Sequence, residues 1–513
     1  MTTKSDKIQS QKNTLVLLCL VAVAVILCYS NSLQGDFQFD DDLTITENER
    51  IKDLNNYLKM DWVSAGLDGS RPVTEFTFAL NYAVGGLNPT GYHFLNLLIH
   101  LAVVSLVYVF TRDMIFLSGH EKPEIPAIIV AGIFGLHPVQ SESVSYISQR
   151  SEALASLFYL MSLLLFIKAG RKGTAVHGLF LYVAGLFAFF LGLGSKEIIV
   201  TLPLVYLLYD FYFLEKKSLL KRLIIPAPFI IAVLIYIIKR LLILKDNTMM
   251  GFGVRETTIW EYLMTQFRVI VTYLRLIVFP VNQNLDYDYP VSRHFFEPGV
   301  VLSFVFLFLI VAFAIIFRHK FKAASFGALW FFIVVSPTSS FVPIIDVIFE
   351  HRIYLAMWGI VMATVMLSYN VYEKLSFKFP DNFKKIKRIS MMIIVLLLMI
   401  LGISLHERNR VWQSKLSLWT DVASKSPNKA RAHNNLGNCY FIRNDFVSAI
   451  PEYRRAILID RKWHESYYNL AVSLEKTGKA SEAVYYYMVF VNEAPDSYNE
   501  IKKQILRKYN IPG

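Results

Sequence analysis

Residues 14–42 read TLVLLCLVAVAVILCYSNSLQGDFQFDDD. The first seventeen of them form a predominantly apolar run, long enough to cross the hydrocarbon of a bilayer. Three aspartates, Asp40, Asp41 and Asp42, follow about ten residues later. Carboxylates this close to a bilayer are costly, and membrane proteins keep them for chemistry, ion handling or a charged ligand. The stretch therefore predicts a helical membrane protein whose first loop has a function.

The composition of the whole chain agrees with this prediction. The 513 residues are 54% hydrophobic, and long blocks of apolar residues alternate with short charged segments. The net charge is +12, but the basic residues fall mainly in short loops, which is the orientation signal of membrane proteins and argues against nucleic-acid binding. Three cysteines give no disulfide framework. Lys4, Lys7 and Lys12 precede the first apolar run without a small-residue cleavage signal, so we expect an uncleaved signal anchor.

The apolar blocks predict an all-α fold, a polytopic membrane helical bundle of about eleven spans plus one re-entrant or interfacial helix. The predicted spans are residues 13–31, 92–111, 124–141, 151–168, 175–194, 197–214, 223–244, 299–317, 322–340, 353–372 and 389–406. The first loop outside the membrane then covers residues 32–91.

The stretch 257–280 is ambiguous. Its polar residues recur at steps of 4, 3, 4 and 3, which places them on one helix face: Glu261, Thr265, Arg268, Thr272 and Arg275. Two arginines facing lipid would cost about 2.5–3.5 kcal/mol each on insertion scales. We predict a re-entrant or interfacial helix on the outer side with this stripe facing a cavity. The alternative is a twelfth span with the stripe inside the bundle, which would put the C-terminal domain in the cytoplasm.

Charge favours eleven spans with a cytoplasmic N-terminus. Four basic clusters then face the cytoplasm, namely Lys168/Arg171/Lys172, Lys216/Lys217/Lys221/Arg222, Arg318/Lys320/Lys322 and Lys374–Arg388. With twelve spans the last two clusters would face outward, against the positive-inside bias.

Hydropathy falls after His406, which divides the chain into a membrane domain, residues 1–406, and a C-terminal domain, residues 407–513. Two segments of this second domain repeat with a step of 34, pairing Asn435-Leu436-Gly437 with Asn469-Leu470-Ala471, Ala449 with Ala483, and Tyr453 with Tyr487. This period predicts tetratricopeptide repeats on the outer side. Such repeats offer a concave surface for peptides or partner proteins; the alternative is a purely stabilising appendage.

On this topology many polar residues converge outside the membrane. They include Asp40–Asp42 and Arg71 in the first loop, His93 with Asn96 and His100 on one helix face, His137, Glu142, Arg150, Glu152, Lys196, Arg268, Arg275, Glu350, His351, Arg352 and Tyr354. Basic groups on the outer face run against the positive-inside trend, so we expect the outer arginines and Lys196 to have a function.

Each of these residues also has a structural alternative. The histidines could be satisfied interface or capping groups, Glu142 and Glu152 could be helix-start carboxylates, and Lys196 could snorkel from a helix end. Glu350 and Arg352 could pair with each other, and Asp40–Asp42 could make a turn or a cap. Histidines and carboxylates could bind a divalent ion, but no fixed metal-ligand spacing occurs, so we expect no required metal or cofactor.

Several motifs occur in a fixed order along the chain. They are Phe39-Asp40-Asp41 with Ile45 and Asn48, Arg71-Pro72-Val73 with Thr77–Tyr82, Gly91-Tyr92-His93 with Asn96 and His100, Leu136–Val144, Ser195-Lys196-Glu197, and Phe349–Tyr354. In motif order and architecture the chain resembles the transmembrane and tetratricopeptide-repeat O-mannosyltransferases, which are GT-C glycosyltransferases, and their prokaryotic relatives. The repeat array is shorter than in the animal proteins.

The resemblance implies an outward-facing active site, a polyprenyl- or dolichyl-phosphate sugar donor, transfer to a hydroxyl, and a catalytic role for Asp40 and Asp41. Our hypothesis makes Asp40 the general base, with Asp41 orienting the acceptor or holding Asp40, and leaves Asp42 solvated. Lys196 and an arginine, which is Arg268, Arg275 or Arg352, would stabilise the leaving phosphate. The substrate-binding residues would be Arg71, His93, His137, Glu142, Arg150, Glu152, Glu350, His351 and Tyr354.

We therefore predict an inverting membrane glycosyltransferase that moves mannose or a similar hexose to an acceptor hydroxyl on the outer face. The acceptor is a protein Ser/Thr or a glycolipid, and protein acceptors would be recruited through the repeats. The alternative function is a non-catalytic scaffold or a transporter of lipid-linked sugars, although a flippase would need access on both faces. With two repeats and no retrieval signal at the end of the sequence, we favour a prokaryotic-type member in the plasma (inner) membrane.

Overall fold

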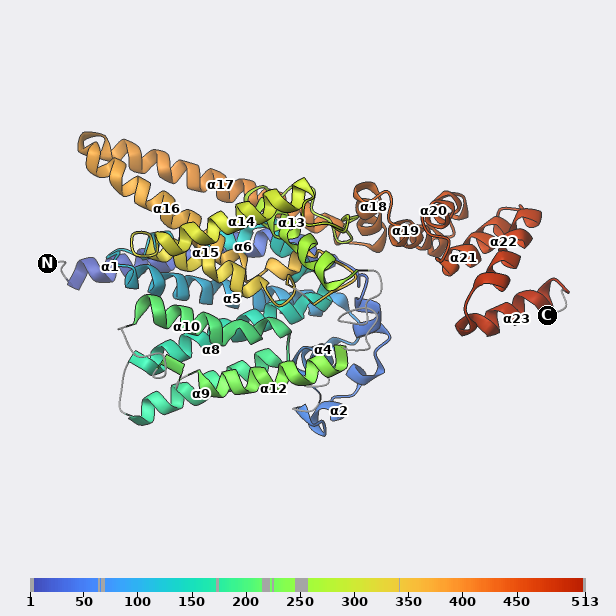
Figure 1. Cartoon of the computed structure of the whole chain (residues 1–513), viewed down its shortest axis with the longest axis horizontal. Helices are drawn as coiled ribbons and strands as arrows, with labels where there is room; N and C mark the ends of the chain where they lie inside the picture. Colours follow the sequence, from blue (N-terminus) through green and yellow to red (C-terminus); the bar gives the residue numbers. More distant parts are fainter. Residues whose placement is uncertain are drawn as a thin grey trace. The chain divides into compact units, whose positions relative to one another are not determined.

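The computed structural model describes residues 4–62, 65, 70–171, 175–214, 222–223, 226–244, 257–340 and 342–510. Throughout these residues the regular secondary structure is helical, without a strand, which confirms the predicted all-α fold (Figure 1). The chain forms two compact units. Unit 1 comprises Met1–Gln283 and Pro290–Arg410, and unit 2 comprises Asn284–Tyr289 and Val411–Gly513.

A helix lies on each of the eleven predicted ranges. The longer helices of unit 1 are α1 (Lys4–Tyr29), α4 (Pro72–Gly85), α5 (Pro89–Leu117), α6 (Glu124–Leu136), α8 (Arg150–Arg171), α9 (Ala175–Leu193), α10 (Leu202–Phe213), α12 (Ala227–Leu244), α13 (Ile259–Val278), α14 (Pro298–Ile316), α15 (Lys322–Val335), α16 (Met357–Lys378) and α17 (Phe383–Val411). Short helices between them include α2 (Asn55–Leu58) and α7 (Ser141–Ser145).

Six of the described helices are long and apolar enough to cross a membrane. They are Lys12–Gln34, Pro89–Leu117, Ile147–Gly170, Val176–Leu193, Pro298–Ile316 and Pro380–Val411. A seventh candidate is the pair Glu124–Leu136 and Pro138–Ser145, which is bent by 50°. The apolar helix α15 has only 14 residues, about 21 Å at 1.5 Å per residue, and so falls short of the hydrocarbon thickness of about 30 Å. These helices indicate a multi-pass membrane protein. The predicted spans beyond these seven stay a prediction.

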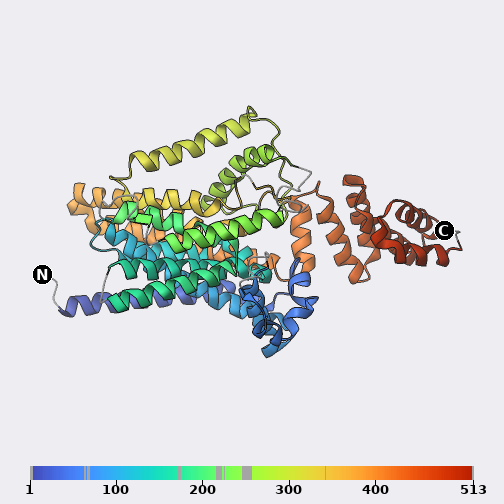
Figure 2. The same cartoon turned by 60° about the horizontal axis from the view of Figure 1, so that its bottom comes forward.

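The centre of unit 1 is held by a close crossing of α15 and α16. A Cβ atom on Gly327 or Gly359 would clash with the facing backbone carbonyl, so glycine at both positions lets the two backbones approach. Trp330 and Trp358 meet edge to face beside this crossing, with ring centroids 4.6 Å apart. The indole of Trp358 donates to Thr111 Oγ1 at 2.7 Å and so ties α16 to α5. Figure 2 shows α14, by contrast, at the edge of the bundle.

Helix α13 is the ambiguous stretch, and it does not qualify as a long apolar helix. It begins with a capping box formed by Thr258 and Glu261. Its buried face attaches to the segment before α16, because Gln266 Nε2 donates to the Val347 carbonyl at 3.0 Å. The polar stripe packs on the following loop: Arg268 donates to Ser292 Oγ at 2.9 Å. We expected the stripe to face a cavity. Instead, Arg268 of the stripe packs against the loop that follows α13.

Unit 2 contains α18 (Lys415–Lys425), α19 (Ala430–Ile442), α20 (Phe446–Ile459), α21 (His464–Lys476), α22 (Ala480–Glu493) and α23 (Asn499–Lys508). The helices of the pair α21–α22 begin 34 residues after those of the pair α19–α20. Gly437 lies against the ring of Tyr453, where a larger residue would not fit. This geometry is compatible with tetratricopeptide repeats, which stay a prediction.

The sequence did not indicate that a segment between α13 and α14 belongs to unit 2. Residues 284–289 lie against the start of the repeats, where the buried Asp286 accepts from Arg431 Nε at 2.6 Å and also pairs with Lys429. Asn284 donates to Ser426 Oγ at 2.8 Å. The predicted C-terminal domain, residues 407–513, therefore lacks the six residues 284–289, which the structure assigns to unit 2.

Candidate functional site

The acidic loop after α1 is locked by one of its own carboxylates. Asp41 is fully buried. Its Oδ1 accepts from the backbone N–H of Ser148 at 2.7 Å and from the Ser148 hydroxyl, and its Oδ2 accepts from the Gln38 N–H at 2.8 Å. Phe39, just before the acidic pair, has φ +46°, a conformation that is strained for a bulky residue. The loop is therefore held in an unfavourable backbone shape by contacts to residues a hundred positions away.

Asp40 is fixed through its backbone and remains half-buried. Its N–H donates to the Tyr146 hydroxyl at 3.0 Å, and its carbonyl accepts from Thr44 N at 2.9 Å and Thr44 Oγ1 at 2.8 Å. The Thr44 and Ser148 hydroxyls lie 2.7 Å apart. These contacts hold the main chain of Asp40 in place, beside the Ser148 that binds Asp41. Asp42, which we expected to be solvated, is half-buried and accepts from Thr46 Oγ1 at 3.4 Å.

Burial raises the pKa of Asp41 to about 7, and the charge of Asp40 adds to the rise, against the hydrogen bonds from Ser148 and Gln38. Two adjacent carboxylates thus have different surroundings. Asp41 is enclosed and has a pKa near neutral pH, whereas Asp40 is half-buried.

A second cluster surrounds Lys196, in the turn between α9 and α10. Lys196 is buried, and its Nζ lies 2.9 Å from Glu152 Oε2 and 2.9 Å from Gln149 Oε1. Arg71 lies 3.5 Å from Glu197 Oε2. The start of α4 is attached to the same turn, because Val73 N donates to the Gly194 carbonyl at 3.0 Å. The sequence places these residues in three segments, and the fold brings them together.

A small cavity adjoins the Lys196 cluster. Glu152, Lys196, Glu197 and Arg352 are among the residues that line it, and its volume of about 10 Å³ has room for about one water molecule. Glu152 Oε1 is buried without a hydrogen-bond partner. Burial lowers the pKa of Lys196, whereas the charge of Glu152 opposes that change. The cluster is thus a compact set of alternating charges, in which Lys196 and Glu152 are buried and Arg71 and Glu197 are partly exposed.

Glu142 and His351 form a third buried pair, from segments 209 residues apart. Glu142 Oε1 lies 2.6 Å from His351 Nδ1, and Glu142 Oε2 accepts from the Glu350 N–H at 3.1 Å. Glu350 accepts from Gln283 Nε2 at 2.6 Å. Burial and the charges of Lys196, Arg352 and Arg71 keep the pKa of His351 well below its usual value. His351 is therefore neutral at pH 7 and lies close to the Lys196 cluster.

The other predicted histidines have structural partners. His93 Nε2 lies 3.1 Å from the Gly35 carbonyl, which ties α5 to the acidic loop, and its Nδ1 is buried without a partner. His100 Nδ1 lies 2.7 Å from the Tyr354 hydroxyl. His137 Nδ1 accepts from the Val139 N–H at 3.2 Å and caps the turn at that point, so its proton is on Nε2, 2.9 Å from the Ile277 carbonyl.

Arg150 is fully buried and holds segments together around the acidic loop. Its Nε donates to Asn96 Oδ1 at 2.6 Å, one terminal nitrogen donates to the Thr77 carbonyl at 3.2 Å, and the other donates to the Tyr92 carbonyl at 2.9 Å. The guanidinium also stacks over the Phe78 ring, 4.6 Å from the centroid. These contacts give Arg150 a positioning geometry, and its predicted role in substrate binding stays a prediction.

The predicted phosphate-binding arginines bond to backbone carbonyls. Arg352 donates to the carbonyls of Asp346 at 2.8 Å and Val347 at 3.1 Å, and it lines the Lys196 cavity. Arg268 donates to the Pro290 carbonyl at 3.2 Å, and Arg275 donates to the carbonyls of Phe279 and Val281. Of the three, Arg352 is the one that the structure joins to Lys196.

Sequence reasoning missed the residues that organise the acidic loop, above all Ser148 and Tyr146. Both precede Arg150 in a stretch rich in serine, Ser141 to Ser151, between two apolar spans. That enrichment is a signal, because small hydroxyls near a membrane span bond buried polar groups. Within the described ranges no group of three or more His, Cys, Asp or Glu side chains could hold a metal ion.

Comparison with known proteins gives relatives along most of the chain. A Caenorhabditis elegans protein, protein O-mannosyl-transferase F38B6.6, is 25% identical over 480 residues, covering 89% of this chain and 64% of the relative. Mouse protein O-mannosyl-transferase TMTC3 is 23% identical over 92% of this chain and 54% of its own length. The chain is a homologue of the TMTC protein O-mannosyl-transferases. This confirms the resemblance seen in the motifs.

A shorter match with higher identity is to mouse protein O-mannosyl-transferase TMTC2, with 33% identity over 213 residues, 37% of this chain and 24% of that TMTC protein. This chain spans roughly half to two thirds of the length of the TMTC relatives that match it throughout. No protein-family model and no solved structure matches the chain.

Proposed function

We propose that this protein is an inverting membrane glycosyltransferase that moves mannose or a similar hexose from a polyprenyl-phosphate donor to an acceptor hydroxyl. The observation that carries the proposal is the geometry of the acidic loop. Asp41 is buried and accepts three hydrogen bonds, and the neighbouring Asp40 is half-buried, with its backbone N–H bonded to Tyr146. The names of the TMTC relatives support the reaction class.

In the proposed reaction Asp40 is the general base. The acceptor oxygen attacks the anomeric carbon, and its proton passes to the Asp40 carboxylate. The bond between that carbon and the phosphate oxygen breaks, and its electron pair stays on the leaving phosphate. Attack opposite the leaving group inverts the configuration. No other co-reactant is needed.

Asp41 is a positioning residue in this proposal, since its two oxygens already accept three hydrogen bonds from Ser148 and Gln38. It holds the strained turn at Phe39 and so fixes the direction of Asp40. Lys196 and Arg352 would stabilise the charge that develops on the phosphate, with Arg71 close by. Glu142 and His351 pair with each other near this group, since the charges of Lys196, Arg352 and Arg71 act on His351.

The site would face the extracytoplasmic side of a plasma (inner) membrane, with a cytoplasmic N-terminus and the repeats outside. Protein acceptors would reach it through the repeats. A divalent ion is not part of the proposal.

The test is transfer by the purified full-length protein in liposomes. Polyprenyl-phosphate [¹⁴C]mannose is supplied with an extract of outer-face proteins, and label in protein is counted. We expect label to enter protein with wild type and not with empty liposomes. Label that stays in lipid under all conditions would contradict the proposal and favour a scaffold, and label that moves across the bilayer without transfer would favour a transporter.

A further inference from the structure

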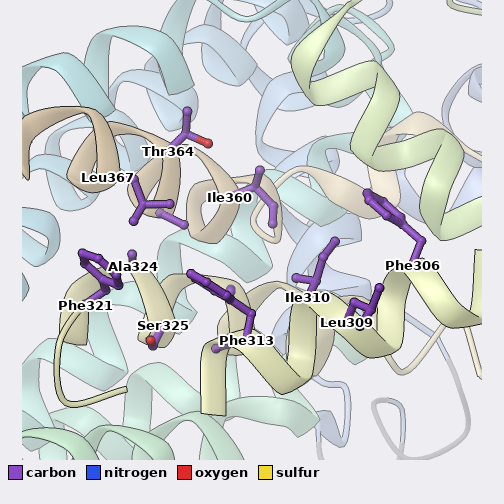
Figure 3. Close-up of a pocket in the computed structure, with 13 residues that line it drawn as sticks. Phe306, Leu309, Ile310, Phe313, Phe321, Ala324, Ser325, Ile360, Thr364 and Leu367 are labelled. Carbon is purple, nitrogen blue, oxygen red and sulfur yellow. The ribbon is translucent and has the colours of Figure 1, made fainter. Parts of the chain in front are cut away.

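A short helical turn, η7 (Glu350–Ile353), carries Arg352, the arginine that lines the same cavity as Lys196. The turn leads into α16, which lines an apolar pocket further along its length, where Leu367 lies opposite Phe313 of α14 (Figure 3). Apolar packing of this kind is non-directional. The orientation of the turn therefore depends on the polar contacts that its own side chains make.

Two side chains from other segments hold the start of this turn. Glu142 Oε1 lies 2.6 Å from His351 Nδ1, and Glu142 Oε2 accepts from the Glu350 N–H at 3.1 Å. Gln283 Nε2 donates to Glu350 Oε2 at 2.6 Å. All four side chains are buried. The position of η7, and with it the position of Arg352, thus depends on Glu142 and Gln283.

The two carboxylates of this group act on each other. Glu142 lies within reach of the like charge of Glu350 and of the opposite charges of Arg408 and Lys196. Arg408, in the last turn of α17, is buried. Like charges in a buried site repel, and a buried cation beside them offsets that repulsion. Arg408 therefore helps to keep the two carboxylates together.

The last turn of α17 is itself fixed beside the segment of Glu142. Asn409, the residue after Arg408, accepts from the Ser145 hydroxyl at 2.8 Å and donates to the Cys28 carbonyl at 3.1 Å. Ser145 is the last residue of α7, the short helix that also contains Glu142. These two hydrogen bonds hold the backbone that carries Arg408 next to α7.

We propose that Gln283 and Arg408 are positioning residues of the candidate site, which together fix the turn that carries Arg352. Gln283 holds the Glu350 side chain, and Arg408 supplies an opposite charge to Glu142. The inference rests on the proposed function, in which Arg352 stabilises the charge on the leaving phosphate. Displacing a catalytic group by about 1 Å can lower a rate ~10²-fold, so the hold on this turn matters to transfer.

The first measurement is hydrogen–deuterium exchange of the full-length protein in nanodiscs, without substrate. Gln283→Leu removes the amide donor, and Gln283→Asn shortens it by one carbon in case the leucine variant does not fold. Arg408→Met removes the charge and Arg408→Lys keeps it. Asn434→Leu is the matched control, because it removes a buried amide that donates to a glutamate in unit 2.

We expect the backbone amides of residues 349–354 to exchange at least about tenfold faster in both Gln283 variants and in Arg408→Met, because the turn then opens more often. Arg408→Lys and Asn434→Leu should exchange there as wild type does. Unchanged exchange at residues 349–354 in the Gln283 variants and in Arg408→Met would overturn the inference.

The second measurement separates positioning from a general loss of stability. In the liposome transfer assay, Gln283→Leu should lower kcat about tenfold in the wild-type background. In an Arg352→Gln background the same change should lower kcat little further, because the group that it positions is absent. A tenfold loss in both backgrounds would overturn the positioning role, since Gln283 would then act independently of Arg352.

The exchange measurement needs no sugar, so the two proposals can fail separately. If wild type transfers no sugar but exchange rises in the variants, the proposed function fails and the hold of Gln283 and Arg408 on the turn stands. If wild type transfers sugar and the variants match it in both exchange and kcat, the positioning roles fail and the proposed function stands.

Discussion

Asp41 in the acidic loop and Lys196 in its cluster are both buried charges, but their partners differ. Asp41 accepts from a backbone N–H of Gln38 and from the N–H and hydroxyl of Ser148, all neutral donors. Lys196 donates to the carboxylate of Glu152 and to a neutral amide. Burial opposes ionisation in both places, yet only Lys196 has a direct counter-charge. The acidic loop is thus suited to a change of protonation, and the lysine cluster to a fixed charge.

The largest combined loss of stability and transfer should come from removing the charge of Lys196. In Lys196→Met the Glu152 carboxylate stays buried without its cation, which costs about 3–5 kcal/mol of unfolding free energy. Transfer should fall about 10²–10³-fold, because a donor to the developing phosphate charge is lost. Thermal unfolding and initial rates measure the two effects.

The double variant Lys196→Met with Glu152→Gln is the control for that prediction. It should regain much of the stability, because no carboxylate remains unpaired, and regain none of the activity. A Lys196→Met protein as stable and as active as wild type would show that the cluster is not a coupled charge site.

The next largest effect should come from Asp41→Asn. An amide offers one acceptor oxygen where the carboxylate accepts three hydrogen bonds, so the variant should lose about 1–3 kcal/mol of stability. We expect its kcat to fall less than that of an Asp40 variant, since Asp40 keeps its bond to Tyr146. Ser148→Ala should reproduce part of the loss. Loss of activity in Asp41→Asn as large as in Asp40→Asn would give Asp41 a direct part in the chemistry.

A smaller effect concerns pH. The folded protein raises the pKa of Asp41 from 3.8 to about 7, so it binds a proton more tightly than the unfolded chain does. The stability from this residue is fully present below about pH 4 and is lost as pH rises through 7. The unfolding free energy of wild type relative to Asp41→Asn should therefore fall between pH 5 and pH 8. A difference that stays constant over this range would contradict the raised pKa.

The smallest effect should come from Arg275→Gln. The half-buried arginine bonds backbone carbonyls of the loop after α13, so its loss should change stability by about 1 kcal/mol and transfer by a few-fold. Arg352→Gln, beside Lys196, should be clearly more harmful to transfer. The reverse order would move the phosphate site from the lysine cluster to α13.

The helices could be predicted from the sequence because their signal is local. The run 92–111 lies within α5, and the polar stripe of residues 257–280 marked α13 as unlike the long apolar helices. The short anchor 284–289 could not be predicted, because its attachment to unit 2 depends on Asp286 meeting Arg431, 145 residues away.

The sequence could predict which residues belong to the candidate site, but it could not predict which of them contact one another. The sequence indicated Asp40, Asp41, Glu142, Lys196 and His351 from their types and places. It could not show that Ser148 clamps Asp41 across 107 residues or that His351 meets Glu142 across 209, since such pairs are made by tertiary packing. His137 caps the turn at Val139, which is the structural alternative that the sequence offered, and its role in substrate binding stays a prediction.

The most direct test of the account compares Asp40→Asn with wild type in the liposome transfer assay, with Asp42→Asn as the matched neighbour. The account predicts a rate about 10²–10⁴-fold lower for Asp40→Asn, unchanged binding of polyprenyl phosphate, and a near-normal rate for Asp42→Asn. Near-normal transfer by Asp40→Asn would contradict the role of Asp40 as the base.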